Sequence, residues 1–165
     1  MDLNIKENKM KIYLAGPCDT ENRTIMWKIA NALRNSNKFQ VYCPWEYQVE
    51  DAWTYSQEDW ASFVFNADIT AIKEADIVLV VSIGRESTAG TNWEQGFAYG
   101  LGKDIVVIQI TNNSTSLMTY CGCDMFLNLN KENIDEFNEQ LNKLIYILQL
   151  PNDLWTHDFC KTVLT

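Results

Sequence analysis

The segment DIVLVVS at residues 76–82 decides the fold class, because it is the clearest strand in the chain. A continuous aliphatic run of this kind is typical of a strand that a parallel sheet buries on both faces. Similar apolar runs occur at residues 11–16, 39–43 and 104–110, and residues 123–129 are a weaker candidate for a fifth strand. We therefore predict a parallel sheet of about five strands.

Helical patterns separate the predicted strands. Apolar residues recur at helical spacing from residue 19 or 20 to about 34, over 58–75 and 91–101, and from 134 until Pro151. The 58–75 helix is apolar on two sides, so we expect it to be largely buried. Strands that alternate with helices imply right-handed βαβ units and an α/β fold with helices on both faces of the sheet. We expect residues 1–10 to form a polar leader and residues 11–165 to form a single domain.

Composition and charge exclude several classes of protein. The 165 residues suit one globular domain, with 47% apolar and 21% charged residues. A net charge of −9 disfavours nucleic-acid polymers and anionic membranes as partners. No apolar run approaches the ~20 residues of a membrane span, and the polar start of the chain does not resemble a signal peptide. We expect a cytoplasmic protein with reduced thiols at Cys18, Cys43, Cys121, Cys123 and Cys160.

A candidate site follows from the predicted sheet, since ligands of open α/β sheets bind beyond the carboxyl ends of the strands. This edge includes residues 16–19, 83–90 and 111–118, and the second of these loops enters a helix through GTNWEQG at 90–96. Glu94 has two interpretations. Thr91 and Glu94 fit a capping box, or Glu94 is a carboxylate at a helix N-terminus that the helix dipole keeps ionised and nucleophilic.

Asp68 is a second candidate, because it lies among the apolar residues of the predicted 58–75 helix. It either occupies an exposed seam of that helix or is partly desolvated, which would raise its pKa toward that of a general acid. Aromatic residues crowd the surrounding span, residues 42–65. We interpret most of them as core, and those of residues 44–57 as a candidate stacking wall for a planar ligand.

The sequence lacks the residues that other common kinds of catalytic site require. The first predicted strand is not followed by GxGxxG, which disfavours a dinucleotide-dependent oxidoreductase. Cys121 and Cys123 with the distant, lone His157 do not make a zinc site, and a single histidine disfavours a histidine-based triad. Carboxylates remain as the catalytic groups, and we expect no metal and no organic cofactor.

Four segments, spanning most of residues 11–120, resemble the nucleoside 2-deoxyribosyltransferase family in the same order. They are KIYLAGP at 11–17, WASFVFNADITAI at 60–72, AGTNWEQGFAYGLGK at 89–103 and SLM at 116–118. The resemblance implies a flavodoxin-like, three-layer α/β/α fold. It also implies a role in nucleoside salvage: transfer of 2-deoxyribose between nucleobases through a covalent glutamyl-deoxyribosyl intermediate, without a cofactor.

The resemblance also implies roles for individual residues. Glu94 matches the nucleophile, which favours the catalytic interpretation over the capping box. Asp68 matches the residue that transfers a proton to or from the base, and Tyr13 matches the tyrosine that positions the nucleophile. Trp60 matches an aromatic residue lining the site. Met118 matches a residue that reaches into a neighbouring subunit's site, so a homo-oligomer with shared sites is expected.

Further substrate contacts are expected at Gly16, Thr88, Gly90 and Ser116, and two of these positions depart from the family. Thr88 stands where the family has an aspartate that binds the sugar hydroxyls, and Ser116 stands where it has an asparagine. These departures leave the recognition of the sugar open. Arg85, Ser87 and Thr88 are a candidate phosphate site, as in relatives that hydrolyse nucleoside monophosphates. The alternatives are therefore an N-glycosidase acting on a nucleoside or its monophosphate, and a non-catalytic nucleoside-binding module.

Overall fold

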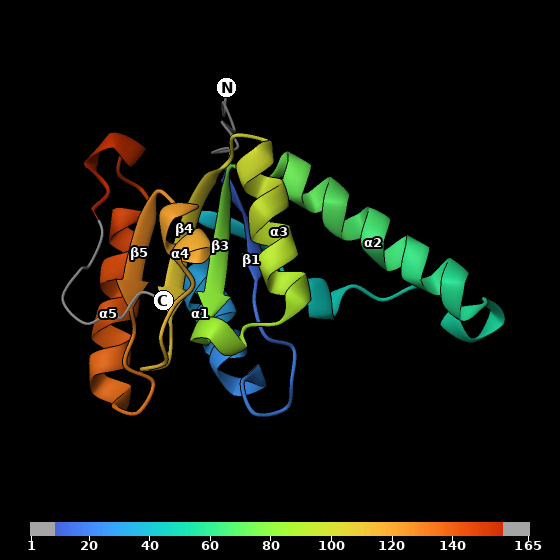
Figure 1. The fold of residues 1–165 in the computed structure, drawn as a ribbon, viewed down its shortest axis with the longest axis horizontal. Coiled ribbons are helices and arrows are strands. Elements are labelled where there is room, and N and C mark those ends of the chain that lie inside the picture. The colour runs from blue at the N-terminus through green and yellow to red at the C-terminus, as the bar shows by residue number, and fades with distance from the viewer. Residues whose placement is uncertain (1–8, 157–165) are drawn as a thin grey trace, which may run out of the picture.

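Five parallel strands form the central sheet of the computed structural model, which describes residues 9–156. The strand order is β2-β1-β3-β4-β5 (Figure 1), the doubly wound order of flavodoxin-like folds. The predicted fold class is confirmed. The strands are β1 Met10–Ala15, β2 Phe39–Tyr42, β3 Ile77–Ser82, β4 Asp104–Gln109 and β5 Met125–Asn128.

Helices cover both faces of the sheet, so the molecule has three layers (Figure 1). Side chains alternate along each strand, and β3 illustrates the result. Ile77, Leu79 and Val81 face the core under α1 and α5, whereas Val78 and Val80 face the core under α2, α3 and α4. The helices are α1 Arg23–Asn35, α2 Gln57–Glu74, α3 Ala89–Gly100, α4 Leu117–Cys121 and α5 Ile134–Ile147.

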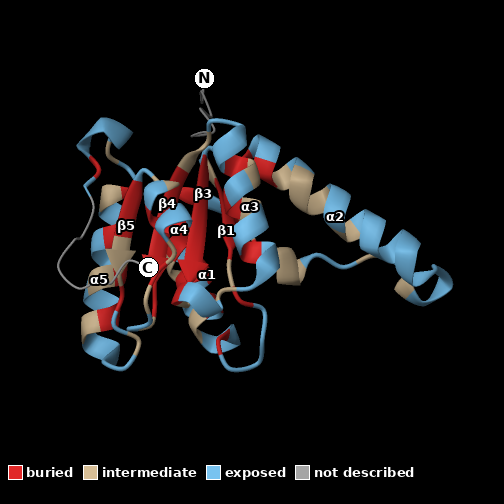
Figure 2. Cartoon of the chain, viewed as in Figure 1, coloured by how far each residue is buried: buried red, intermediate tan, exposed pale blue. Residues whose placement is uncertain are grey.

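The expectation that the 58–75 helix is largely buried is wrong. In α2 only Ile72 is buried, while Trp60, Phe63 and Phe65 are 42%, 41% and 54% exposed. The C-terminal end of α2 meets the body of the protein, and its N-terminal turns extend away from it (Figures 1 and 2). To be buried on two sides, α2 would need a packing partner on each side. The sheet packs against one side only, and only at the last turns of the helix.

Local capping explains where the structure departs from the expected element boundaries. The first helix begins at Arg23 rather than near residue 20, because the Asp19 carboxylate accepts the backbone N–H of Asn22 at 3.0 Å and forms a turn before the helix. The expected loop at 111–118 ends in α4, whose N-cap is Ser116. β1 starts at Met10, within the expected polar leader.

Several expectations concern the ends of the chain and its thiols. Cys18, Cys43, Cys121 and Cys123 are free thiols, as predicted, and Cys160 lies outside the described residues. Between residues 9 and 156, none of the helices has the length and apolar character needed to cross a membrane.

Candidate active site

Glu94 is held by a tyrosine from the centre of the sheet. Tyr13, fully buried on β1, donates a hydrogen bond from its hydroxyl to Glu94 Oε1 at 2.7 Å. The N-cap of α3 is Thr88, whose hydroxyl accepts the backbone N–H of Thr91 at 3.3 Å. The capping box of Thr91 and Glu94 is therefore wrong. The true cap lies three residues earlier, and the Glu94 carboxylate is directed to Tyr13 instead.

Asp68 is held in a parallel manner by a second tyrosine. Tyr42, the last residue of β2, donates its hydroxyl to Asp68 Oδ1 at 2.9 Å. Tyr13 and Tyr42 are register partners in the β1–β2 ladder. Their rings are stacked, with centroids 5.5 Å apart and planes inclined by 16°. Two stacked tyrosines on neighbouring strands thus each hold one carboxylate, one on α3 and the other on α2.

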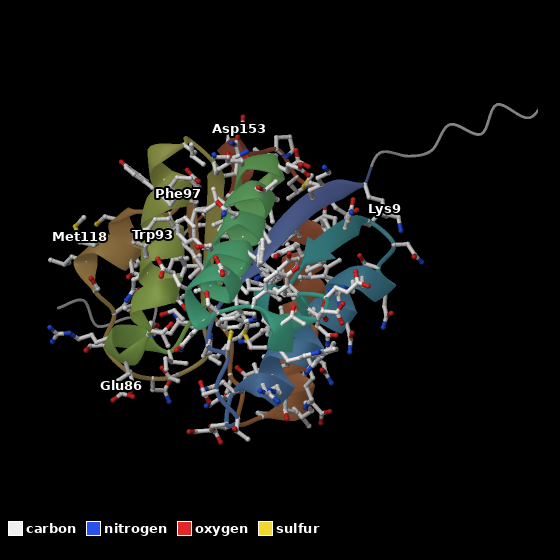
Figure 3. All side chains as sticks on the ribbon, turned by 90° about the vertical axis from the view of Figure 1, so that its right-hand side faces the viewer. Lys9, Glu86, Trp93, Phe97, Met118 and Asp153 are labelled. Carbon is white, nitrogen blue, oxygen red and sulfur yellow. The ribbon has the colours of Figure 1, made fainter. Side chains whose placement is uncertain are left out.

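Both carboxylates line one cavity of about 430 Å³ between α2 and α3. Trp93 and Phe65 form its aromatic wall, with ring centroids 5.6 Å apart, and Phe97 stacks on Trp93 at 5.3 Å. Figure 3 shows Trp93 and Phe97 along α3. The aromatic side chains at the cavity therefore come from α2 and α3, not from residues 44–57 as expected. The lining residues are Phe65, Asp68, Ile69, Ile72, Ala89, Gly90, Trp93 and Glu94.

Burial shifts the titration of both carboxylates. It raises the pKa of Glu94 from 4.5 to about 7; the hydrogen bond from Tyr13 opposes this rise, and the negative charge of Asp68 adds to it. Burial also raises the pKa of Asp68, against the hydrogen bond from Tyr42. The expectation that the helix dipole keeps Glu94 ionised is therefore wrong. Glu94 lies in the second turn of α3, beyond the first turn where the dipole acts, so desolvation dominates.

Four other residues were predicted for this site, and each has a different structural role. Gly90 lines the cavity with the carboxylates. Gly16 follows β1, and a Cβ there would come within 2.6 Å of Met26 Cε, so close packing accounts for the glycine. The Thr88 hydroxyl is engaged with the N–H and hydroxyl of Thr91 as the helix cap. Trp60 lies two turns before Asp68 on the exposed part of α2.

Ser116 and Met118 belong to a second cavity, of about 440 Å³, which they line with Gln95 and Tyr99. Ser116 caps α4 by accepting the Met118 backbone N–H at 3.2 Å. The Met118 side chain is 82% exposed and points away from the body of the protein (Figure 3). Glu94, Asp68, Tyr13 and Gly90 are thus brought together, and Ser116 and Met118 are not brought to them.

Tyr42 and the wall residues Phe65 and Trp93 were not among the expected site residues. The sequence carries no local signal for Tyr42, because its place beside Tyr13 results from the pairing of β1 with β2. Within residues 9–156, no group of three or more His, Cys, Asp or Glu side chains is arranged to hold a metal ion. His157 lies outside the described residues.

We predict that Glu94→Gln stabilises the fold at alkaline pH. Because the pKa of Glu94 is higher in the folded protein than in the unfolded chain, wild-type stability falls as the pH rises through the window from 4.5 to about 7. Glutamine does not ionise and can still accept the Tyr13 hydroxyl. A shift of this size corresponds to about 3 kcal/mol, so urea unfolding at about pH 8.5 should show a gain approaching that value.

At about pH 5 the same variant should gain less than about 1 kcal/mol, because Glu94 is then protonated in the folded protein. Glu139→Gln, an exposed carboxylate on α5, is the matched control and should show no such dependence on pH. An equal gain for Glu94→Gln at both pH values would contradict the assignment of the raised pKa to Glu94.

Comparisons with known proteins identify the family of the chain. The model of the nucleoside 2-deoxyribosyltransferase family matches residues 12–144. A nucleoside deoxyribosyltransferase of Lactobacillus johnsonii is 24% identical over 132 residues, covering 72% of this chain and 89% of that protein. A solved 2-deoxyribosyltransferase from Bacillus psychrosaccharolyticus is 30% identical, with a TM-score of 0.62 over 76% of this chain and 90% of its own.

A CMP N-glycosidase from Clostridium botulinum shares the fold at 19% identity, with a TM-score of 0.54 over 81% of this chain and 97% of its own. The family model extends from the third residue of β1 into α5, and so contains both carboxylates and both tyrosines. The chain belongs to the nucleoside 2-deoxyribosyltransferase family.

Proposed function

We propose that the protein transfers 2-deoxyribose between nucleobases by two successive displacements at C1′. The observation that carries this proposal is the pairing of Glu94 and Asp68 at one cavity, each fixed by a tyrosine hydroxyl. A nucleophilic carboxylate and a proton-carrying carboxylate are the two groups that a retaining displacement at an anomeric carbon requires.

In the first displacement, an oxygen of ionised Glu94 attacks C1′ while the bond from C1′ to the base nitrogen breaks. Protonated Asp68, directly or through water, gives its proton to the departing base, so the base leaves neutral. The transition state resembles an oxocarbenium ion, and the product is a deoxyribosyl ester of Glu94.

In the second displacement, a nitrogen of the incoming base attacks C1′ from the face that the first base left. The ester bond to Glu94 breaks, and Asp68 takes up the proton that the incoming base loses. Two inversions at C1′ retain the β configuration, and Glu94 and Asp68 return to their starting protonation states.

The surroundings of the carboxylates suit this cycle. Burial raises the pKa of Glu94 to about 7 and also raises the pKa of Asp68, so each carboxyl group holds a proton more readily here than in water. The hydrogen bond from Tyr13 favours the ionised form of Glu94, as a nucleophile requires. The wall of Phe65 and Trp93 offers a π-face on which a planar base can stack.

Free nucleosides are the favoured substrates over monophosphates. The Ser87 hydroxyl accepts the Ile83 backbone N–H at 3.0 Å, and the Thr88 hydroxyl caps α3. Of the proposed phosphate ligands, Arg85 is left as an exposed side chain, whereas phosphate sites usually gather several donors. The proposal includes a role in nucleoside salvage in the cytoplasm, without a metal or cofactor. It also includes an oligomer in which the exposed Met118 reaches the site of a neighbouring subunit.

The decisive experiment is incubation with a deoxynucleoside, with and without a second base, followed by chromatography of the products. We expect a new deoxynucleoside when the acceptor base is present, and little free deoxyribose without it. Free sugar as the main product in both incubations would favour the N-glycosidase, and binding without turnover would favour a non-catalytic module. A parallel incubation with deoxynucleoside monophosphate should be slower. Faster turnover of the monophosphate, abolished by Arg85→Ala, would overturn the choice of substrate.

A further inference from the structure

Tyr42 is the contact of Asp68 that the family resemblance leaves without a role. Its hydroxyl donates to Asp68 Oδ1 at 2.9 Å, and its ring stacks on Tyr13, which holds Glu94. The two tyrosines are directly paired across β1 and β2. The stacked rings therefore place the hydrogen-bond donor to Asp68 beside the hydrogen-bond donor to Glu94 on adjacent strands.

Tyr42 approaches Asp68 from outside the cavity that the carboxylates share. Phe65, Asp68 and Ile69 line that cavity from one face of α2. Tyr42 instead lines a separate hollow of about 460 Å³ with residues of another face of α2, among them Asn66 and Thr70. Tyr42 is thus placed to act on the substrate through Asp68, not to contact the substrate itself.

The hydrogen bond also distinguishes the two oxygens of Asp68. Because Oδ1 accepts the Tyr42 hydroxyl, Oδ2 is the oxygen that carries the proton when the carboxyl group is neutral. A fixed carboxyl group delivers this proton along one direction, whereas a freely rotating one would lose much of the benefit of positioned acid catalysis.

We propose that Tyr42 is the positioning residue of Asp68: it fixes the carboxyl group so that Oδ2 exchanges the proton with the departing and incoming bases. This inference rests on the proposed function, in which Asp68 is the proton carrier. It assigns to β2 a part in the reaction, because the strand that pairs with β1 supplies the hydroxyl.

The proposed role of Tyr42 can be detected in the pH dependence of kcat, because the Tyr42 hydroxyl affects the pKa of Asp68. Burial raises the pKa of Asp68 and the hydrogen bond from Tyr42 lowers it, so loss of the hydroxyl should raise this pKa further. The other titratable groups within its electrostatic reach are Glu94 on α3, Tyr13 on β1 and Cys18 in the loop after β1. None of these groups is altered when Tyr42 is replaced by phenylalanine.

The first test is Tyr42→Phe, which keeps the ring stacked on Tyr13 and removes the hydroxyl alone. We expect kcat to fall on the order of 10- to 100-fold, with KM within about threefold. The alkaline limb of the kcat profile should move to higher pH, because Asp68 stays protonated to higher pH. Tyr146→Phe, a 64% exposed tyrosine on α5, is the matched control and should leave both quantities unchanged.

The second test repeats Tyr42→Phe in an Asp68→Asn background as a double-mutant cycle. If Tyr42 acts through Asp68, its hydroxyl should matter less than about twofold once the carboxylate is absent. An equal loss in both backgrounds, or an alkaline limb that does not move, overturns the inference. The position of the limb does not depend on the amount of folded enzyme, so a less stable variant still gives a result.

If the wild-type protein transfers no deoxyribose, the proposed function is wrong. If Asp68→Asn turns over at the wild-type rate, Asp68 is not the proton carrier and Tyr42 cannot act through it. If Asp68→Asn is slow and Tyr42→Phe is unaffected in rate and pH profile, the role of Tyr42 alone is wrong.

Discussion

Glu94→Gln is expected to lower turnover on the order of 10⁴- to 10⁶-fold, the range observed when the nucleophile of a covalent mechanism is removed. Glutamine matches glutamate in shape and can accept the Tyr13 hydroxyl, so the loss should come from the missing nucleophile and not from a changed fold. Initial rates of deoxyribosyl transfer measure the effect, and Glu139→Gln on α5 should retain normal rates.

A direct check of the same prediction is to trap the intermediate with a 2-fluoro-2-deoxyribosyl substrate and to locate the adduct by mass spectrometry. The adduct should lie on the peptide that contains Glu94 and should be missing from Glu94→Gln. Near-normal turnover by that variant, or an adduct on another residue, would remove Glu94 from its proposed role.

Asp68→Asn is expected to slow kcat by roughly 10²- to 10⁴-fold, because general acid–base assistance contributes about this much. Asparagine can still accept the Tyr42 hydroxyl through its side-chain oxygen, so binding of the substrate should change little. Steady-state kinetics separate the two parameters, and Asp135→Asn, an exposed carboxylate in the first turn of α5, is the control. A change confined to KM would show that Asp68 binds the substrate without moving a proton.

The pH profile of Asp68→Asn provides a second measurement. The negative charge of Asp68 contributes to the raised pKa of Glu94, so its removal should lower that pKa. The acid limb of kcat/KM, which reports protonation of the nucleophile in the free enzyme, should therefore move to lower pH. A limb that stays in place would indicate that the charge of Asp68 does not act on Glu94.

The central strands were predictable because local pattern and tertiary environment agree in them. The aliphatic run of β3 is buried along its whole length, as its sequence indicates. The predicted burial of α2 was wrong for the opposite reason. Two apolar stripes show which faces of a helix could be buried, but they do not show which other elements pack against those faces. The cap of α3 is Thr88 and not Thr91, because the Thr88 hydroxyl accepts the Thr91 backbone N–H.

The catalytic candidates depended on more than local pattern. Tyr13 and Glu94 are 81 positions apart, and Tyr42 and Asp68 are 26 apart. Their pairing results from the register of the sheet and the seating of two helices on it, which no local spacing encodes. Glu94 and Asp68 were candidates from the local sequence, and the resemblance to a known family favoured their catalytic interpretation and added Tyr13. Tyr42 lies outside the matched segments and became visible only in the assembled structure.

The one-to-one pairing of Tyr13 with Tyr42 makes enzymatic activity a reporter of strand alignment during folding. Side chains alternate between the faces of a sheet, so a slip of β2 by one residue would turn Tyr42 toward the α1 and α5 side. Phe39 and Val41, which are buried on that side in the native register, would then turn the other way. A chain trapped in this alignment could remain compact and rich in secondary structure, although Asp68, the proposed proton carrier, would have lost its hydrogen bond from Tyr42. Recovery of deoxyribosyl transfer after refolding would therefore measure correct strand pairing more strictly than circular dichroism does.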